Sequence, residues 1–295
     1  MSAAKITEAV KSGKVLISDG AWGTALIQKG LTPGECPEEW NLTHFDAVRE
    51  IAAGYCAAGA DMVETNSFGA NRLKLALFGL EDKTAEINEK AALASREAAG
   101  NDRWVIASVG PTGKLLIMEE VTEEEMYGAF REQAEALEKG GADALCIETM
   151  SDVEEAALAV KAAKENTGLE VIVTFTFSRT VRGEYRTMMG VSPADAVHAM
   201  ESAGADIVGA NCGNGIEQMI EIAREMRAVT EKPVLIQANA GLPQNVDGVD
   251  VFPDTPEDMA RFVPALIQAG ANIIGGCCGT TPAHIRAMKA AVVSR

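Results

Sequence analysis

GADMV (59–63) recurs three times along the chain with small changes, as GADAL (141–145), GADIV (204–208) and GANII (270–274). In each copy a glycine follows an amphipathic segment and precedes a short apolar run. This order is typical of a helix that ends at glycine and then turns into a buried strand. The repeat therefore predicts four units in which a helix is followed by a strand.

Further apolar runs of strand character lie before and between these copies, at 15–18, 104–109, 171–177 and 234–237. Helical periodicity in the intervening segments predicts helices over 47–58, 85–99, 123–139, 153–164, 194–202, 216–229 and 256–268. Eight strands that alternate with helices predict an α/β fold, a single (β/α)8 TIM barrel. An open doubly wound sheet is the alternative, but no G-x-G-x-x-G motif opens a helix after the first strand.

Composition bounds the class of protein and its partners. The 295 residues are 47% hydrophobic and carry a formal net charge of −17, and no break in composition divides them, so we expect one barrel domain over residues 1–295. A negative surface repels phosphate backbones and anionic lipids, so we expect neither a nucleic-acid partner nor a membrane. We find no apolar run of membrane-spanning length and no signal peptide, and we expect a cytoplasmic protein with reduced cysteines.

Polar and thiol side chains gather where the predicted strands end, which is where β/α barrels form their active sites. These positions include Asp19-Gly20, 65–69, 110–113, Glu148-Thr149, 211–213, 239–241 and 277–279. They hold more carboxylates, amides and thiols than strand packing requires. We therefore expect the functional site at this end of the barrel.

Cys212, Cys277 and Cys278 are the candidate metal ligands, because each follows a predicted strand beside glycine. Neighbouring side chains of a regular strand point to opposite faces, so we expect the flanking glycines to supply the torsions that turn both Cys277 and Cys278 toward the barrel mouth. The sixth and eighth strands are separated by one strand, a distance that inward-pointing side chains span. Three thiolates with one open position describe a catalytic zinc site, with hydrophobic packing or a redox pair as alternatives.

Zinc with an open position suits a thiol substrate, because coordination lowers the pKa of the thiol while the sulfur remains nucleophilic. The histidines do not follow predicted strands, which disfavours a histidine-based mechanism. They are His44, His198 and His284. The other cysteines, Cys36, Cys56 and Cys146, are expected to pack as small hydrophobic side chains.

Four segments resemble the homocysteine S-methyltransferase family: DGAWGT (19–24), TNSFGAN (65–71), NCG (211–213) and GCCGTTP (276–282). The likeness extends over almost the whole chain and is greatest to the homocysteine-binding module of cobalamin-dependent methionine synthase. It implies a zinc-dependent enzyme that methylates the thiol of homocysteine or a similar thiol, with a methylcorrinoid protein as the expected donor. Because the sequence ends at Arg295, we expect the folate- and cobalamin-binding modules to be absent.

The resemblance also implies roles for the metal and amino-group ligands. Cys212, Cys277 and Cys278 would hold zinc, with the homocysteine sulfur as fourth ligand. Asp19 and Glu148 would receive the substrate amino group. A helix cap is the alternative role for Asp19, and a structural ion pair is the alternative for Glu148.

The remaining substrate contacts implied by the resemblance involve backbone amides and one asparagine. Amides around Asn66, Ser67 and Phe68 would hold the substrate carboxylate, and Gly20 would belong to the same binding surface. Asn239 would lie beside the metal, where it is a candidate ligand when substrate is absent.

Other functions remain open from the sequence alone. The donor could instead be S-methylmethionine or betaine, or the chain could serve corrinoid-dependent one-carbon catabolism with another thiol acceptor. The segment Arg179 to Met189 is expected to be an irregular loop whose arginines contact either solvent or an anionic group of a partner. The non-enzyme alternative is a zinc-containing module that binds an amino acid without turnover.

Overall fold

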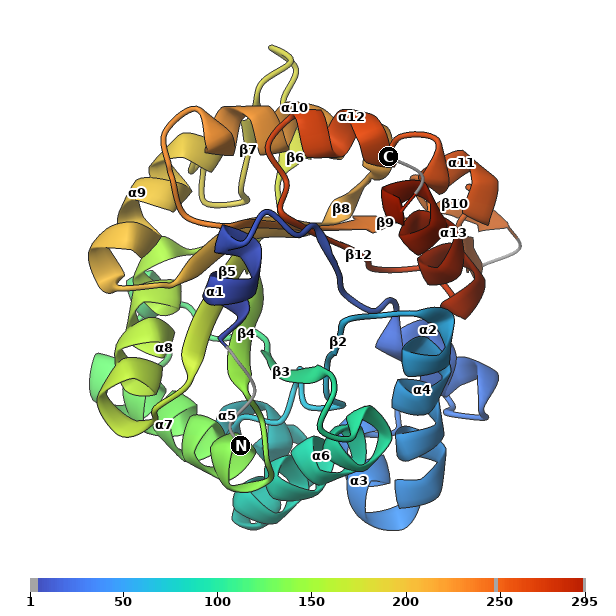
Figure 1. Cartoon of the computed structure of the whole chain (residues 1–295). Coiled ribbons are helices and arrows are strands. Elements are labelled where there is room, and N and C mark those ends of the chain that lie inside the picture. Colours follow the sequence, from blue (N-terminus) through green and yellow to red (C-terminus); the bar gives the residue numbers. More distant parts are fainter. Residues whose placement is uncertain (1–4, 247–248, 294–295) are drawn as a thin grey trace.

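The strands of the computed structural model, which describes residues 5–246 and 249–293, form a nearly closed ring surrounded by helices (Figure 1). The 8-stranded parallel sheet has the order β1 (Leu16–Ile17), β12 (Ile273–Gly276), β9 (Val234–Asn239), β8 (Ile207–Gly215), β5 (Glu170–Phe175), β4 (Ala144–Met150), β3 (Trp104–Val109) and β2 (Met62–Val63). The two ends of the sheet meet where the Asp61 N–H donates to the Ile17 carbonyl at 2.7 Å. The predicted TIM barrel is confirmed.

The outer layer contains the predicted helices, with a break in the one expected over 256–268, and a further helix over 282–293 that was not predicted. Its members are α4 (Phe45–Ala58), α6 (Thr84–Ala99), α7 (Glu123–Lys139), α8 (Val153–Asn166), α9 (Pro193–Ala203), α10 (Ile216–Arg227), α11 (Pro256–Ala260), α12 (Val263–Gln268) and α13 (Pro282–Val293). The prediction of one continuous helix over 256–268 is wrong. Pro264 has no N–H to donate within a helix and its ring crowds the preceding turn, so a new helix begins with proline in its first turn. None of the helices in the described ranges has the length and apolar composition that crossing a bilayer requires.

A short helix that was not predicted, α1 (Ile6–Lys11), closes one end of the barrel. In Figure 1 it lies inside the ring of outer helices, beside β5, and Ile6 and Val10 pack into a buried cluster with Leu16, Met62 and Ile106 at the strand beginnings. The Ile6 N–H also donates to the Glu170 carboxylate at 2.6 Å. The opposite end, where the strands finish, is not covered by this helix.

The repeated segment has a structural role that its sequence did not reveal. Its third residue accepts a hydrogen bond from a backbone N–H near the start of the neighbouring strand: Asp61 from Ile17 (2.8 Å), Asp143 from Val105 (2.8 Å), Asp206 from Val171 (2.7 Å) and Asn272 from Val234 (3.0 Å). A cation from a helix contacts each of these side chains: Lys289, Arg96, Lys164 and Arg227. The repeat therefore joins the strands in pairs.

The sequence predicted an irregular loop from Arg179 to Met189, but part of this segment forms paired strands. β6 (Ser178–Arg179) pairs antiparallel with β7 (Tyr185–Arg186), and the pair projects outward at the top of Figure 1. Tyr185 is only 3% exposed and packs in the core, which anchors the hairpin. A second antiparallel pair, β10 (Gln244–Val246) with β11 (Val249–Val251), follows β9.

Candidate active site

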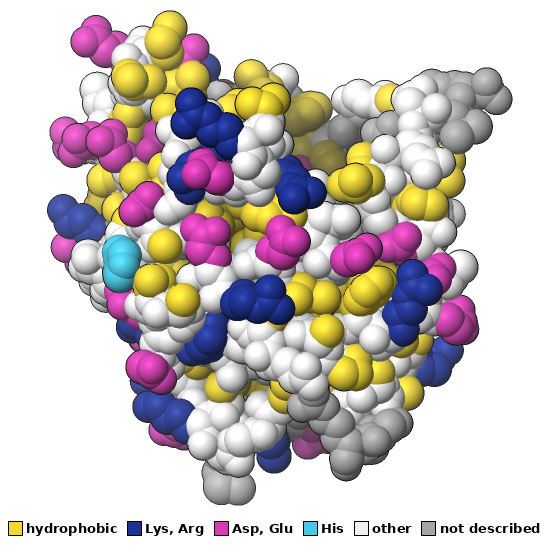
Figure 2. All heavy atoms as spheres, turned by 90° about the horizontal axis from the view of Figure 1, so that it is seen from above, with side chains coloured by type: hydrophobic (Ala, Val, Ile, Leu, Met, Phe, Trp, Pro, Cys, Tyr) yellow, Lys and Arg dark blue, Asp and Glu magenta, His cyan; other side chains and the backbone are white. Residues whose placement is uncertain are grey.

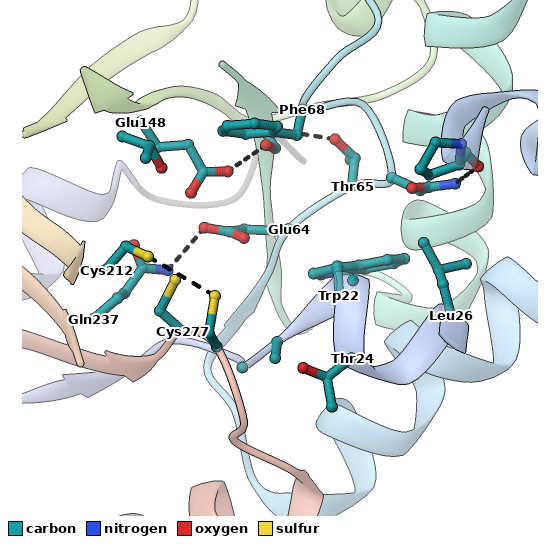
Figure 3. A pocket seen from close by; sticks show the side chains of 18 of the residues that line it. Trp22, Thr24, Leu26, Glu64, Thr65, Phe68, Glu148, Cys212, Gln237 and Cys277 are labelled. Carbon is teal, nitrogen blue, oxygen red and sulfur yellow. Dashed lines mark hydrogen bonds between the residues drawn. The ribbon is translucent and has the colours of Figure 1, made fainter. Parts of the chain in front are cut away.

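A cavity of about 280 Å³ lies at the end of the barrel where the strands finish (Figure 3). Sulfur atoms line one side, carboxylates and hydroxyl groups line the floor, and apolar side chains that include Trp22, Leu26 and Phe68 line another side. No lysine, arginine or histidine belongs to the lining within the described part of the chain. The cavity therefore suits a small ligand with a positive charge near the carboxylates and with a second group that binds on the side of the cysteine sulfurs.

Three cysteine sulfurs converge in this cavity. The Sγ atoms of Cys212, Cys277 and Cys278 all lie within 4.8 Å of one another, and those of Cys212 and Cys278 are 3.8 Å apart. Sulfur ligands of a tetrahedral zinc ion, with Zn–S bonds of about 2.3 Å, lie about 3.8 Å from one another. The donor set therefore fits zinc in both chemistry and spacing.

The local backbone explains how adjacent cysteines face the same cavity. β12 ends at Gly276, so Cys277 and Cys278 lie in a turn rather than in a regular strand. The left-handed torsion expected of the flanking glycines occurs at Gly279 (φ +79°). Gly276 has another role: a Cβ there would lie 2.3 Å from the Thr280 hydroxyl, so only glycine allows the chain to pack this closely.

Negative charge in the sulfur cluster is concentrated on one thiol. Hydrogen bonds from the thiols of Cys277 and Cys278, together with the Gly213 N–H, lower the pKa of Cys212 to about 3. The interaction with Cys212 raises the pKa of Cys278 to about 12 and holds that of Cys277 above its ordinary value. A divalent cation would displace the remaining protons, because it favours the thiolate form of all its ligands.

Three buried carboxylates surround the floor of the cavity. Burial raises the pKa of Asp19 to about 6 and that of Glu148 to about 7, and burial with the nearby Glu148 charge raises that of Glu64 well above 4.5. Glu64 and Glu148 line the cavity, and Figure 3 shows both beside the sulfur cluster. A cationic group would relieve this mutual repulsion, so the floor is suited to an ammonium group.

The segment after β2 offers hydrogen-bond donors at the opposite side of the cavity. Asn66, Ser67 and Phe68 all line it. The Ser67 N–H donates to the Thr65 carbonyl at 2.9 Å, whereas the N–H groups of Asn66 and Phe68 have no acceptor among the described residues. Two backbone amides without an acceptor among the described residues form a site suited to one carboxylate.

The comparison with known families decides the class of this cavity. The model of the family described as homocysteine S-methyltransferase matches residues 16–292. The chain belongs to the homocysteine S-methyltransferase family. The predicted family is confirmed.

Relatives of known name support the same membership in the homocysteine S-methyltransferase family. The chain is 33% identical to methionine synthase of Mycobacterium tuberculosis over 97% of its own length and to that of Mycobacterium leprae over 95%. It covers only 25% and 24% of these two relatives. The metallated form of the homocysteine methyltransferase MmuM from Escherichia coli has a similar structure, with a TM-score of 0.78 and 25% identity over 96% of this chain and 98% of that one.

Two residues that the family resemblance implicates lie behind the cavity wall. Asp19 is fully buried, and its carboxylate accepts hydrogen bonds from the Trp22 indole N–H at 2.9 Å and the Glu64 N–H at 2.8 Å. Ala21 is the N-cap of α2 (Trp22–Gln28), so Asp19 does not cap that helix.

Asn239 hydrogen-bonds Cys212, and its buried Oδ1 has no partner among the described residues. Gly20, by contrast, lines the cavity directly.

Glu64 and Gln237 are among the lining residues that were missed from the sequence. Glu64 precedes the polar run that was noticed after β2, and Gln237 lies within an apolar strand. Gln237 Nε2 donates to Glu64 at 2.7 Å, while its Oε1 is buried without a partner among the described residues. A polar side chain inside the apolar run 234–238 was the signal available for Gln237. For Glu64 the signal was its place directly after a buried strand.

The remaining cysteines and the histidines do not belong to the lining of this cavity. Cys36, Cys56 and Cys146 are buried in hydrophobic clusters, as expected of small apolar side chains. His284, at the start of α13, contacts the Asp254 carbonyl and the Thr281 hydroxyl.

Proposed function

We propose that this chain is a zinc-dependent methyltransferase that methylates homocysteine. The observation that carries this proposal is the arrangement of one cavity: three sulfurs on one side, buried carboxylates on the floor, and free backbone amides beyond them. These groups match the thiol, ammonium and carboxylate of one small amino acid. We further propose that residues 1–295 form a single barrel domain of the homocysteine-binding type.

The proposed residue roles follow from this match. Cys212, Cys277 and Cys278 would hold zinc, and zinc bound there supplies a Lewis acid that keeps the homocysteine sulfur as a nucleophilic thiolate at neutral pH. Glu148, together with Glu64, would accept hydrogen bonds from the substrate ammonium. Asp19 would support this end of the cavity through its hydrogen bond from the Glu64 N–H.

The other end of the substrate would be held by the backbone. The free N–H groups of Asn66 and Phe68 would donate to the carboxylate, with Ser67 and Gly20 completing the surface around it. Asn239 would orient Cys212 through their hydrogen bond. Bound in this way, homocysteine presents its sulfur at the mouth of the cavity for attack on the methyl carbon of the donor.

We propose a methylcorrinoid carried by a separate protein as the donor. The large hydrophobic side chains that are exposed in the described part of the chain all lie in segments between the end of a barrel strand and the next helix of the outer ring. Such a distribution around the mouth of a cavity is typical of a surface that a macromolecule covers. The resemblance of the sequence to the homocysteine-binding module of cobalamin-dependent methionine synthase supports a corrinoid donor.

The test combines metal analysis with product detection. Wild-type protein should contain one zinc ion per chain and should form methionine from homocysteine and methylcobalamin, whereas Cys212→Ala should lose both metal and turnover. Cys56→Ala, which changes a buried cysteine that does not line the cavity, is the matched control and should retain both. Product formation by Cys212→Ala without metal would refute the zinc mechanism. Faster turnover with S-methylmethionine or betaine would refute the corrinoid donor.

A further inference from the structure

We propose that Asn211 is a positioning residue that couples the amino-group end of the cavity to the sulfur end. The proposal rests on the function proposed above. Asn211 lies in β8 directly before Cys212 and is only 1% exposed. Its side chain connects three strands, and both of its polar atoms are fully used.

Toward the floor of the cavity, Asn211 fixes the carboxylate of Glu148. Its Nδ2 donates to Glu148 Oε2 at 3.2 Å, while the Ser108 hydroxyl donates to Glu148 Oε1. Each oxygen is therefore held by one donor. Because a carboxylate oxygen accepts more than one hydrogen bond, both retain capacity for an ammonium group.

Toward the sulfurs, Asn211 restrains two residues with unfavourable backbone torsions. Thr149 (φ +60°) and Cys212 (φ +58°) both have left-handed conformations, which are unfavourable for residues other than glycine. Asn211 Oδ1 accepts from the Thr149 N–H at 2.8 Å, and Asn211 Nδ2 donates to the Thr149 hydroxyl at 2.7 Å. The Thr176 hydroxyl donates to the Asn211 carbonyl at 2.9 Å, immediately before Cys212.

The pairing of the strands changes at the same place. The register of β8 with β9 shifts after Asn211, and that of β4 with β5 shifts after Ile147, next to Glu148. Asn211 therefore bridges two irregular strand ends that regular backbone hydrogen bonds do not hold. One amide sets the position of the ammonium acceptor relative to that of the Cys212 sulfur.

The chemistry of an amide is required at this position. An aspartate has the same shape and keeps the acceptor for Thr149 and Thr174, but it loses both N–H donors and places a negative charge beside Glu148. Alanine removes all the contacts of the side chain. The two substitutions therefore separate loss of the Glu148 contact from loss of the whole network.

The experiment measures coupling between the two ends of the substrate. Dissociation constants of zinc-loaded protein are measured for homocysteine and for 4-mercaptobutanoate, which lacks only the amino group. Wild type should prefer homocysteine, and Asn211→Asp and Asn211→Ala should reduce that preference about tenfold, the size of coupling found between residues of one hydrogen-bonded network. Asn214→Ala is the matched control, because Asn214 is a buried asparagine of the same strand whose amide donates to the Phe177 carbonyl at 2.7 Å.

The control should lower thermal stability yet keep the preference for homocysteine. Thr174→Val removes one hydrogen bond to Asn211 Oδ1 and should reduce the preference in the same direction, so the test survives if Asn211 variants fold poorly. Equal weakening of both thiols by the Asn211 variants, or an unchanged preference, would overturn this inference alone. A wild-type protein that binds zinc but shows no preference for homocysteine would overturn the proposed function and this inference together.

Discussion

Glu148 combines burial with a place in the cavity lining, so its ionisation links stability to substrate binding. Burial raises its pKa from 4.5 to about 7, which means that the folded protein binds this proton more tightly than the unfolded chain does. The stabilisation from the protonated group is complete below pH 4.5 and is lost as the pH rises through about 7. In the substrate-free protein, the free energy of unfolding should therefore fall over this interval.

Glu148→Gln should reduce that fall, because a neutral amide of the same shape does not titrate. Urea unfolding of the metal-free protein at several pH values measures the effect, with Glu154→Gln at the solvent-exposed start of α8 as the control. The variant should also bind homocysteine about tenfold more weakly, since a charged hydrogen bond contributes about 1.5–3 kcal/mol. A pH profile identical to that of wild type would show that the pKa of Glu148 does not differ between the folded and unfolded protein, which would contradict the raised pKa.

At the scale of the elements, the repeated Asp or Asn joins each strand pair through a buried backbone N–H. Asp206→Ala should leave the Val171 N–H without an acceptor and destabilise the protein by about 1–3 kcal/mol. Asp206→Asn should cost much less, because Asn272 has the equivalent role in the fourth copy. Chemical denaturation of the two variants checks the difference. Equal destabilisation would mean that the ion pair with Lys164, and not the backbone contact, carries the effect.

Periodicity predicted the barrel strands and most helices of the outer layer, because burial of one face of each helix and both faces of each strand is encoded locally. Local patterns also placed Cys212, Cys277 and Cys278 at strand ends, and the structure brings their sulfurs together. Pro264 was a signal that the helix over 256–268 is broken, but the prediction gave more weight to the apolar pattern around it. The network of Asn211 could not be predicted in this way, since its partners come from β4 and β5 and are set only when the barrel closes.

At the scale of the whole molecule, charged side chains are spread over the surface, whereas exposed hydrophobic side chains gather in places. Acidic and basic side chains are interspersed on the face shown in Figure 2, and hydrophobic side chains gather on a projection at its upper left. The exposed hydrophobic residues near the cavity mouth include Ile117 (73% exposed) and Met118 (64%) after β3, and Val181 and Met188 beside the β6–β7 hairpin. A small donor needs only the cavity itself, whereas a donor carried by a protein would bury these side chains.

The double variant Ile117→Ser with Met118→Ser tests whether this surface receives a carrier protein. Because both side chains are exposed and neither lines the cavity, zinc content, thermal stability and turnover with free methylcobalamin should equal those of wild type. With a methylcorrinoid protein as donor, kcat/KM should fall about tenfold, since loss of central apolar contacts weakens protein association by 1 kcal/mol or more. The ratio of the two rates isolates docking from chemistry. If both donors were used as fast as by wild type, this part of the rim would lie outside the docking surface; if both slowed equally, the substitutions would have disturbed the cavity instead.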